Sequence, residues 1–285
     1  MISLSRRFLL LLLCTFALGA CRSVPSSPPD KLSIGVVNLE SSDRQLEQYT
    51  KLKDYLSQKL NSLVELEPTY NEIQALTQIQ AHRWDLVFAP PGVVALAIAK
   101  SRYRPIFAME GRLENRSVLI VRQDSPIQVL KELNGKKVAF GQPGSATGYY
   151  LPLFNLYGLT LAEAALADTP KTIMGWVAQQ RVDAGALSQA EFNRYRTEFP
   201  QQKFRILYTD NHPVPSGAVL LSPNLEAKQQ AALTQALADN SPTVAASAGY
   251  LPEAPVPSYS YLIQVVERVA PIAQKINLKP APLYE

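Results

Sequence analysis

Short apolar runs rich in β-branched residues alternate with segments of helical periodicity along most of the chain after residue 31. The run at 32–37 is strand-like, and leucines and a tyrosine then recur at three- and four-residue steps between 46 and 60, as on one face of a helix. Strands and helices continue to alternate up to residue 99. This pattern predicts an α/β fold with mostly parallel strands, whose ligand site usually lies at their carboxyl ends.

Two long apolar strands are expected far apart in the sequence, at 117–121 and 218–221. Further helical and strand segments lie between them, including strands at 138–140 and 182–187. Two similar strands that bracket such a unit suggest a pair of crossing strands between two lobes. A single doubly wound sheet is the alternative, and periodicity alone does not decide between the two arrangements.

The charges of the chain are nearly balanced. Lys and Arg number 28 against 24 Asp and Glu, and Arg6 and Arg7 lie in a segment that we expect to be removed. Nucleic-acid binding normally needs a clustered basic face, so this class of partner is not expected. The composition, 47% apolar and 18% charged, is that of a globular protein rather than a disordered or multi-span membrane protein.

The first twenty residues have the pattern of a secretory signal. Two arginines precede an apolar run at 8–19, which is about a dozen residues long, whereas a membrane-spanning helix needs about twenty. The tetrapeptide LGAC at 18–21 resembles the lipobox of bacterial lipoproteins. The resemblance implies removal of residues 1–20 and a lipid on Cys21; a plain signal with a chance cysteine is the alternative. Segment 21–30, rich in serine and proline, is expected to be a flexible tether.

A glycine-rich loop at 141–150 follows the strand at 138–140 and precedes an apolar helical segment. Small residues let backbone N–H groups approach a ligand, and Ser145 and Thr147 add hydroxyls where the helix begins. A helix N-terminus has unpaired N–H groups and partial positive charge, so the loop favours an anion, best a tetrahedral oxyanion. Serine and threonine also cap helices for purely structural reasons, and the pattern leaves both interpretations open.

Several segments, in consistent order between 32 and 261, together resemble the substrate-binding proteins of phosphonate, phosphite and phosphate ABC importers. The segments are LNGKKVAF at 133–140, QPGSATGY at 142–149, DLVFAP at 85–90, VDAGA at 182–186, HPVP at 212–215 and GYLP at 249–252.

The resemblance implies a two-lobed periplasmic binding protein of type II-like architecture, with two α/β lobes joined by crossing hinge strands. Residues 31–119 plus 219–285 would form lobe 1, and residues 120–218 would form lobe 2. Such proteins close on a ligand in the cleft by hinge motion. The implied partners are a small oxyanion and the permease and ATPase subunits of an importer, on the outer side of the cytoplasmic membrane. A monomer without a cofactor is expected.

The resemblance also implies site residues. Ser145 and Thr147 match hydroxyls that hold the phosphonate oxygens, with Gly148 the following glycine, and Tyr70 matches an aromatic residue that contacts the anion from the first lobe. Ala146 is expected in the same site but departs from the family, because relatives commonly place a third hydroxyl there.

Two further site residues are expected. Pro90 lies in the loop that matches the family's Gly-Pro loop, and Asp183 is either a residue of the cleft rim or a structural turn residue. Val93 replaces a tyrosine of phosphonate binders, and Gly217 replaces an acidic residue that pairs with an aminoalkyl group in some members. A buried amine without a counter-charge is costly, so an aminoalkylphosphonate is not expected.

The sequence thus predicts a lipid-anchored receptor for phosphate, phosphite, a small alkylphosphonate or another small oxyanion. The alternative is the same fold binding a different small organic or inorganic ligand for a membrane sensor. An enzyme is not expected, because no nucleophile–base pair can be recognised. A metal site is not expected either, since His82 and His212 are the only histidines and fall in separate segments. Cys14 and Cys21 are the only cysteines, so the processed chain could form no internal disulfide.

Overall fold

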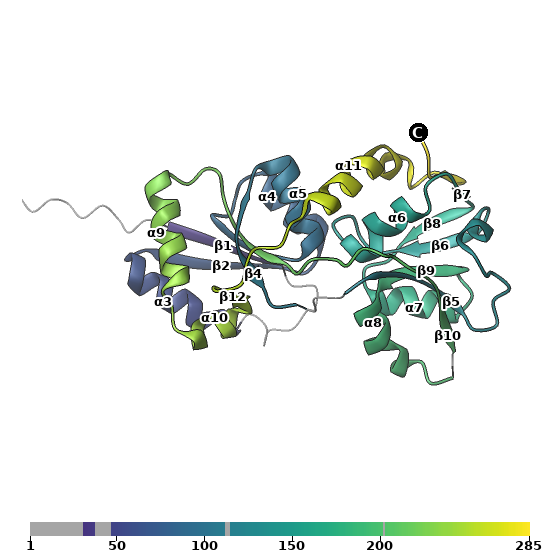
Figure 1. Cartoon of the computed structure of the whole chain (residues 1–285), viewed down its shortest axis with the longest axis horizontal. Helices are drawn as coiled ribbons and strands as arrows, with labels where there is room; N and C mark the ends of the chain where they lie inside the picture. The colour runs from purple at the N-terminus through teal and green to yellow at the C-terminus, as the bar shows by residue number, and fades with distance from the viewer. Residues whose placement is uncertain (1–30, 38–46, 112–114, 202) are drawn as a thin grey trace, which may run out of the picture. The chain divides into compact units, whose positions relative to one another are not determined.

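Two separate β-sheets, each covered by helices, organise the protein (Figure 1). The structure is a computed structural model that describes residues 31–37, 47–111, 115–201 and 203–285. The expected signal, tether and lipidation site at Cys21 lie outside the described residues. The presence of two sheets excludes the alternative of one doubly wound sheet.

The first sheet has a parallel core and an antiparallel flank. β1 lies between β2 and β3 and is parallel to both, whereas β11 runs antiparallel to β3 and β4. Across the sheet the strands are β12 (Tyr250–Leu251), β4 (Arg104–Met109), β11 (Ala218–Leu221), β3 (Leu86–Ala89), β1 (Lys31–Val37) and β2 (Leu63–Thr69).

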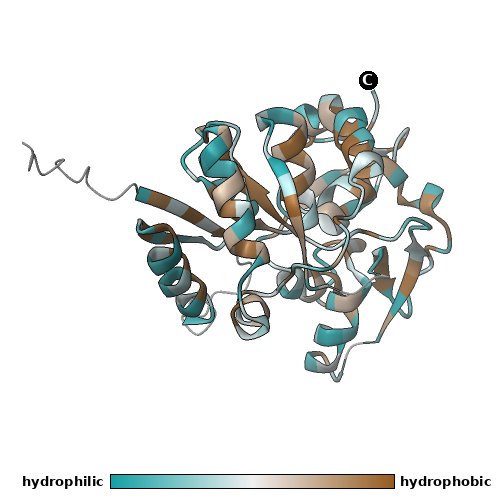
Figure 2. Ribbon diagram, turned by 60° about the vertical axis from the view of Figure 1, so that its left-hand side comes forward, coloured by the Kyte–Doolittle hydropathy of each residue, from teal (hydrophilic) through white to brown (hydrophobic). Residues whose placement is uncertain are grey.

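Both faces of this sheet are buried. Successive side chains of a strand point to opposite faces. Leu86 and Phe88 therefore pack into one apolar cluster with α3 (Thr50–Leu60), α9 (Ala227–Ala238) and α10 (Pro242–Ala248), while Val87 and Ala89 pack into another with α4 (Glu72–Gln80) and α5 (Pro91–Ser101). Figure 2 shows apolar residues along the strands and hydrophilic residues on the outer faces of the helices. Burial on both faces explains the continuous apolar runs in the sequence.

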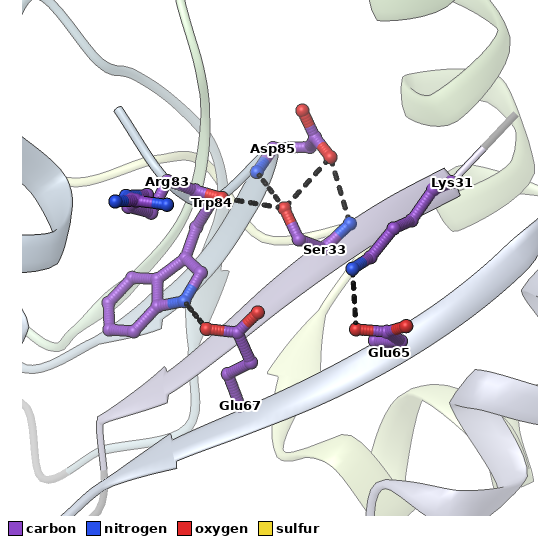
Figure 3. A network of polar contacts seen from close by, with 7 residues as sticks. All are labelled: Lys31, Ser33, Glu65, Glu67, Arg83, Trp84 and Asp85. Carbon is purple, nitrogen blue, oxygen red and sulfur yellow. Dashed lines mark hydrogen bonds and ion pairs between the residues drawn. The ribbon is translucent and has the colours of Figure 1, made fainter. Parts of the chain in front are cut away.

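A polar network joins the start of β1 to the turn before β3 (Figure 3). The Ser33 amide donates to Asp85 Oδ2 at 2.8 Å, and the Ser33 hydroxyl donates to the Arg83 carbonyl at 2.8 Å. Trp84 lies against Gly35 so closely that a Cβ there would stand 2.2 Å from the indole ring. Trp84 Nε1 donates to Glu67 Oε2 on β2 at 2.9 Å, so the three parallel strands are joined by side chains as well as by the backbone.

The second sheet is built from the middle of the chain. β6 is parallel to β8 and β9, and β5 is antiparallel to β9 and β10. In order, its strands are β10 (Phe204–Thr209), β5 (Ser117–Arg122), β9 (Ala184–Ser188), β6 (Lys137–Phe140) and β8 (Glu163–Leu166). Its helices are α6 (Leu151–Asn155), α7 (Pro170–Ala178) and α8 (Gln189–Tyr195), with short turns η1 (Leu130–Leu133), η2 (Ala146–Tyr150) and η3 (Arg196–Glu198).

The chain crosses between the sheets twice. It leaves the first sheet after β4 and enters the second at β5, and it returns from β10 to β11. The crossings are hydrogen-bonded to each other, since the Val214 amide donates to the Asn115 carbonyl at 2.7 Å and Arg116 donates to the Asp210 carbonyl at 3.0 Å. The two apolar strands expected to cross each lie within one sheet, and the crossing is made by the segments beside them.

The C-terminal helix α11 (Ser260–Lys275) touches elements of both parts. It contacts α5 and also α6 and η2, and its buried residues join the apolar cluster of the second sheet. After it, β13 (Ala281–Pro282) pairs with β7 (Thr160–Leu161). The lobe boundaries drawn from the sequence at 119 and 219 stay a prediction, and the chain from α11 onward has contacts beyond the first sheet. Among the described residues, no helix combines the length and the apolar character needed to cross a membrane.

Candidate functional site

A cavity of about 330 Å³ lies where the chain after β2 meets the glycine-rich loop after β6. Its walls come from four places: the start of α4, the loop 141–148, the chain before α7, and the end of β9 with α8. Its lining residues are Tyr70, Glu72, Gly141, Gln142, Ser145, Gly148, Ala167, Asp168, Thr169, Pro170, Ile173, Ala186, Leu187, Glu191 and Tyr195.

The glycine-rich loop folds back on itself through local hydrogen bonds. The Gly141 amide donates to the Gly148 carbonyl at 2.8 Å, and the Ser145 amide donates to the Gln142 carbonyl at 3.0 Å. Gly144 has φ +115°, a value that favours glycine over residues with a side chain. Ser145 Oγ accepts from the Gly148 amide at 3.1 Å and so caps η2, a single π-type turn that leads into α6.

This loop is in direct contact with α4 and α5, which cover one face of the other sheet. An ideal Cβ on Gly144 would lie 2.2 Å from Glu72 Cβ at the start of α4. A Cβ on Gly92, in the first turn of α5, would lie 1.9 Å from the Gly144 carbonyl oxygen. Only glycines let the loop and the two helices come this close.

Three of the residues predicted from the sequence meet in the cavity. Tyr70, which follows β2, is 44% exposed and lines it from the first-sheet side. Ser145 and Gly148 line it from the loop. Ala146 and Thr147 lie beside it without lining it: Ala146 packs in the apolar cluster of the second sheet, and the carbonyl of Thr147 accepts from the buried Ser117 hydroxyl at 2.6 Å.

Pro90 and Asp183 lie elsewhere. Pro90 precedes α5 and lines a different cavity, of about 270 Å³, next to the crossing segments. Asp183 Oδ2 accepts from the Lys137 amide at 2.8 Å, and its own amide donates to the Lys137 carbonyl at 2.8 Å. These bonds join the beginnings of β6 and β9, at the ends of the strands opposite to the glycine-rich loop. This geometry favours the interpretation of Asp183 as a structural turn residue.

Two of the three positions that depart from the family, Gly217 and Val93, have structural explanations. A Cβ on Gly217 would lie 2.3 Å from the Ala89 carbonyl oxygen, so no acidic side chain fits there. Val93 is fully buried in the apolar cluster between α4, α5 and the first sheet. Neither residue lines the main cavity, and neither contributes to its chemistry.

Three carboxylates that the sequence analysis did not identify line the cavity. They are Glu72 at the start of α4, Asp168 before α7, and Glu191 in the first turn of α8. Asp168 accepts from Gln142 Nε2 at 2.9 Å, and Glu191 accepts from the Ser188 amide at 2.7 Å.

Glu72 is buried, with 7% of the residue exposed. Burial raises its pKa to about 7, and the nearby Glu191 carboxylate adds to the rise. A sequence signal existed for Glu191, because S-x-x-E at 188–191 is a capping box. For Glu72 the signal was its place in the first helical turn after a parallel strand.

The cavity has no basic side chain among its described lining residues, and its donors are neutral. Within the part of the chain that the structure describes, no group of three His, Cys, Asp or Glu residues could hold a metal ion. The chemistry available is therefore hydrogen bonding by hydroxyl, amide and phenol groups, together with carboxylates.

The comparisons with known proteins agree with this fold. Among solved structures, XAC2383 from Xanthomonas citri bound to ATP has a TM-score of 0.69 and 21% identity, covering 84% of this chain and 98% of the other. PhnD1 from Prochlorococcus marinus in complex with methylphosphonate has a TM-score of 0.63 and 18% identity, and it also covers 84% of this chain and 98% of the other. A binding protein component of an ABC phosphonate transporter from Pseudomonas aeruginosa has a TM-score of 0.58 and 15% identity, covering 78% of this chain and 80% of the other.

The neighbours confirm the predicted periplasmic-binding-protein fold with two α/β sheets. A family model described as "ABC transporter, phosphonate, periplasmic substrate-binding protein" matches residues 34–254, which is most of the chain. The chain therefore belongs to the phosphonate-binding family of periplasmic substrate-binding proteins of ABC transporters.

Proposed function

We propose that this protein captures a small phosphorus oxyanion in the cavity between the α4 start and the glycine-rich loop, and delivers it to an ABC permease. The observation that carries the proposal is the meeting of Tyr70, Ser145 and Gly148, contributed by distant parts of the chain, around one cavity. Neutral donors fixed by the fold bind an anion without a salt bridge, and enclosure excludes competing water. The methylphosphonate complex of a structural neighbour supports this choice of ligand class.

The proposal includes two lobes that hinge at the crossing segments, one formed by 31–119 plus 219–285 and the other by 120–218. The contact of Gly92 and Glu72 with Gly144 then belongs to the closed state. The ligand leaves the cavity chemically unchanged, and the protein works as a monomer with permease and ATPase subunits. A histidine-kinase ectodomain recovered in place of the permease after cross-linking would favour the sensor alternative.

Titration calorimetry of the full chain in detergent micelles tests the binding step. The ligands are phosphate, phosphite, methylphosphonate and 2-aminoethylphosphonate. We expect micromolar or tighter binding of at least one of them, and weaker binding by Ser145→Ala, which removes the cap that orients the loop. No heat and no thermal shift with any of the four would remove the proposal.

We also propose that the protein is anchored through a lipid on Cys21, outside the cytoplasmic membrane. Growth with an alkyne-labelled fatty acid tests the anchor directly. The wild type and the matched control Cys14→Ala should carry the label, and Cys21→Ala should not. Label on Cys21→Ala, or its absence from the wild type, would contradict the anchor and leave ligand capture untouched.

A further inference from the structure

β8 forms one edge of the second sheet. It pairs with β6, and none of the described strands lies on its other side (Figure 1). Leu166 is the register partner of Phe140, and the Phe140 carbonyl accepts from the next amide, that of Ala167, at 2.8 Å. Successive residues of a strand present their backbone groups to opposite sides, so the N–H and C=O groups of Ala164 and Leu166 point away from β6.

A cavity of about 640 Å³ lies beside this open edge. All four residues of β8 line it, together with the end of α7 and the segment after α11. Lys279 of that segment pairs with Glu163 at 2.6 Å between Nζ and Oε1. This ion pair joins the segment to the first residue of β8, and the cavity leaves room for an extended chain beside the rest of the strand.

Positive charge gathers around this cavity. Lys137, Arg181 and Lys279 line it, and Glu163 is the one carboxylate among its described lining residues. Glu163 is paired with Lys279, whereas no ion pair with another described residue engages Lys137 or Arg181. The Arg181 guanidinium lies 4.9 Å from the centroid of the Trp176 ring, so an aromatic surface adjoins the charge.

The cations lie on one face of the sheet. Ala165 and Trp176 pack against the same apolar cluster, which contains residues of α7. Glu163, two residues before Ala165, and its register partner Lys137 point to this face as well, because side chains alternate along a strand. Arg181 follows α7 and stacks on Trp176 there. A strand added at the edge would place every second side chain next to these groups.

We propose that the open edge of β8 is a docking site for an extended acidic segment of a protein partner. The segment adds a strand to the second sheet, and its alternate carboxylates lie beside Lys137 and Arg181. Main-chain hydrogen bonds to Ala164 and Leu166 supply the pairing. A second copy of this chain is disfavoured as the occupant, because it would bring the same positive groups together.

This inference goes beyond ligand capture. The cavity beside β8 shares none of its described lining residues with the cavity between α4 and the glycine-rich loop. Lys137 begins β6, whereas the glycine-rich loop follows the end of β6. The docking site and the proposed ligand site therefore lie at opposite ends of this strand, and a partner on β8 leaves the ligand site free.

Fluorescence anisotropy with labelled peptides tests the proposal on the full chain in neutral detergent micelles. The probe is a capped six-residue peptide of alternating glutamate and valine. One matched peptide has glutamine in place of glutamate, and another keeps the acidic sequence but is N-methylated at every amide. We expect the glutamine peptide to bind at least about threefold more weakly than the probe. The N-methylated peptide should lose at least about tenfold, because it cannot donate to a strand edge.

A matched pair of double variants tests the residues. Lys137→Gln with Arg181→Gln should weaken binding of the acidic peptide at least about threefold, as for the loss of two partly exposed ion pairs. Lys51→Gln with Lys228→Gln removes two exposed lysines from α3 and α9 and should bind like the wild type. Added salt should weaken binding of the acidic peptide by the wild type, because it screens exposed charges.

The proposal is overturned if the folded wild type does not bind the acidic peptide, or binds the glutamine or N-methylated peptide equally well. Unchanged binding by the Lys137 and Arg181 double variant also overturns it. Without peptide binding, attachment to phosphatidylglycerol vesicles would assign the cations to a membrane surface, and dimerisation lost in that variant would assign the edge to a second copy. If the variant does not fold, the three peptides on the wild type decide. Oxyanion capture stands or falls separately in every case.

Discussion

Replacing Gly144 by alanine tests whether the loop contact with α4 and α5 forms the enclosed site. Two costs arise. The residue has φ +115°, where an L side chain is strained by about 1–3 kcal/mol. Its new Cβ would also stand 2.2 Å from Glu72 Cβ, and overpacking of this kind costs about 1–3 kcal/mol.

The chain offers a matched control. Gly158 also has positive φ, +93°, but a Cβ there would meet no atom within 4 Å. Gly158→Ala therefore isolates the backbone cost, about 1–3 kcal/mol in urea unfolding. The excess loss of Gly144→Ala over this control measures the contact with Glu72. If hinge opening relieves the contact, the two variants should lose the same unfolding free energy, and the cost of the contact should instead weaken ligand binding by Gly144→Ala.

Paired urea unfolding and calorimetry distinguish these results. We expect Gly144→Ala to lose at least about tenfold in affinity for whichever ligand binds the wild type, because about 1.4 kcal/mol of the closed-state contact corresponds to that factor. Gly158→Ala should bind normally. Equal unfolding free energies for the two variants together with unchanged affinity for Gly144→Ala would refute the reasoning.

Four further outcomes are expected. Ser145→Ala should lose about 1 kcal/mol of unfolding free energy, since the cap on the Gly148 amide is lost; an unchanged urea midpoint would contradict the cap. Asp183→Ala should lower stability by about 1–2 kcal/mol through the unpaired Lys137 amide while leaving ligand affinity intact, and altered affinity would return Asp183 to the site. The pKa of Glu72 is raised from 4.5 to about 7, so the folded protein holds a proton that the unfolded chain has released; the stability from this group should fall as pH rises from about 4.5 to 7, and Glu72→Gln should flatten that slope in urea unfolding. Gly217→Ala should destabilise by about 1–3 kcal/mol against the Ala89 carbonyl, and wild-type stability would show that the backbone there can shift.

The central strands could be predicted because a strand that is buried on both faces is a continuous apolar run in the sequence. The apolar runs at 32–37, 117–121 and 218–221 correspond to β1, β5 and β11. β4, with an exposed Arg104 and with Pro105, lacked that pattern, and β7, β12 and β13 have only two residues each. Their pairing is decided by neighbours distant in the chain, which a local pattern does not contain.

The site could be predicted in part, where it depends on local features of the chain. The Ser145 cap and the glycine bend are local features, and the family motif drew attention to them and to Tyr70. Glu72 was missed because its burial arises from contact with Gly144, which is 72 positions away in sequence and lies in the loop after β6 of the second sheet. Thr147 is buried and does not line the cavity, and its carbonyl accepts from the Ser117 hydroxyl, a contact 30 positions away that the local sequence does not contain.

If the two sheets rotate apart as the proposed hinge requires, the position of α11 limits that rotation. A helix of 16 residues that touches α5 on one side and α6 and η2 on the other must travel with one neighbour and slide along the other whenever the sheets rotate apart. Its two sets of contacts would restrict the amplitude of such a rotation. The pairing of β13 with β7 also holds the segment after α11 in place. In the proposed hinge motion, the amplitude would thus depend on a segment that contributes none of the described lining residues of the cavity.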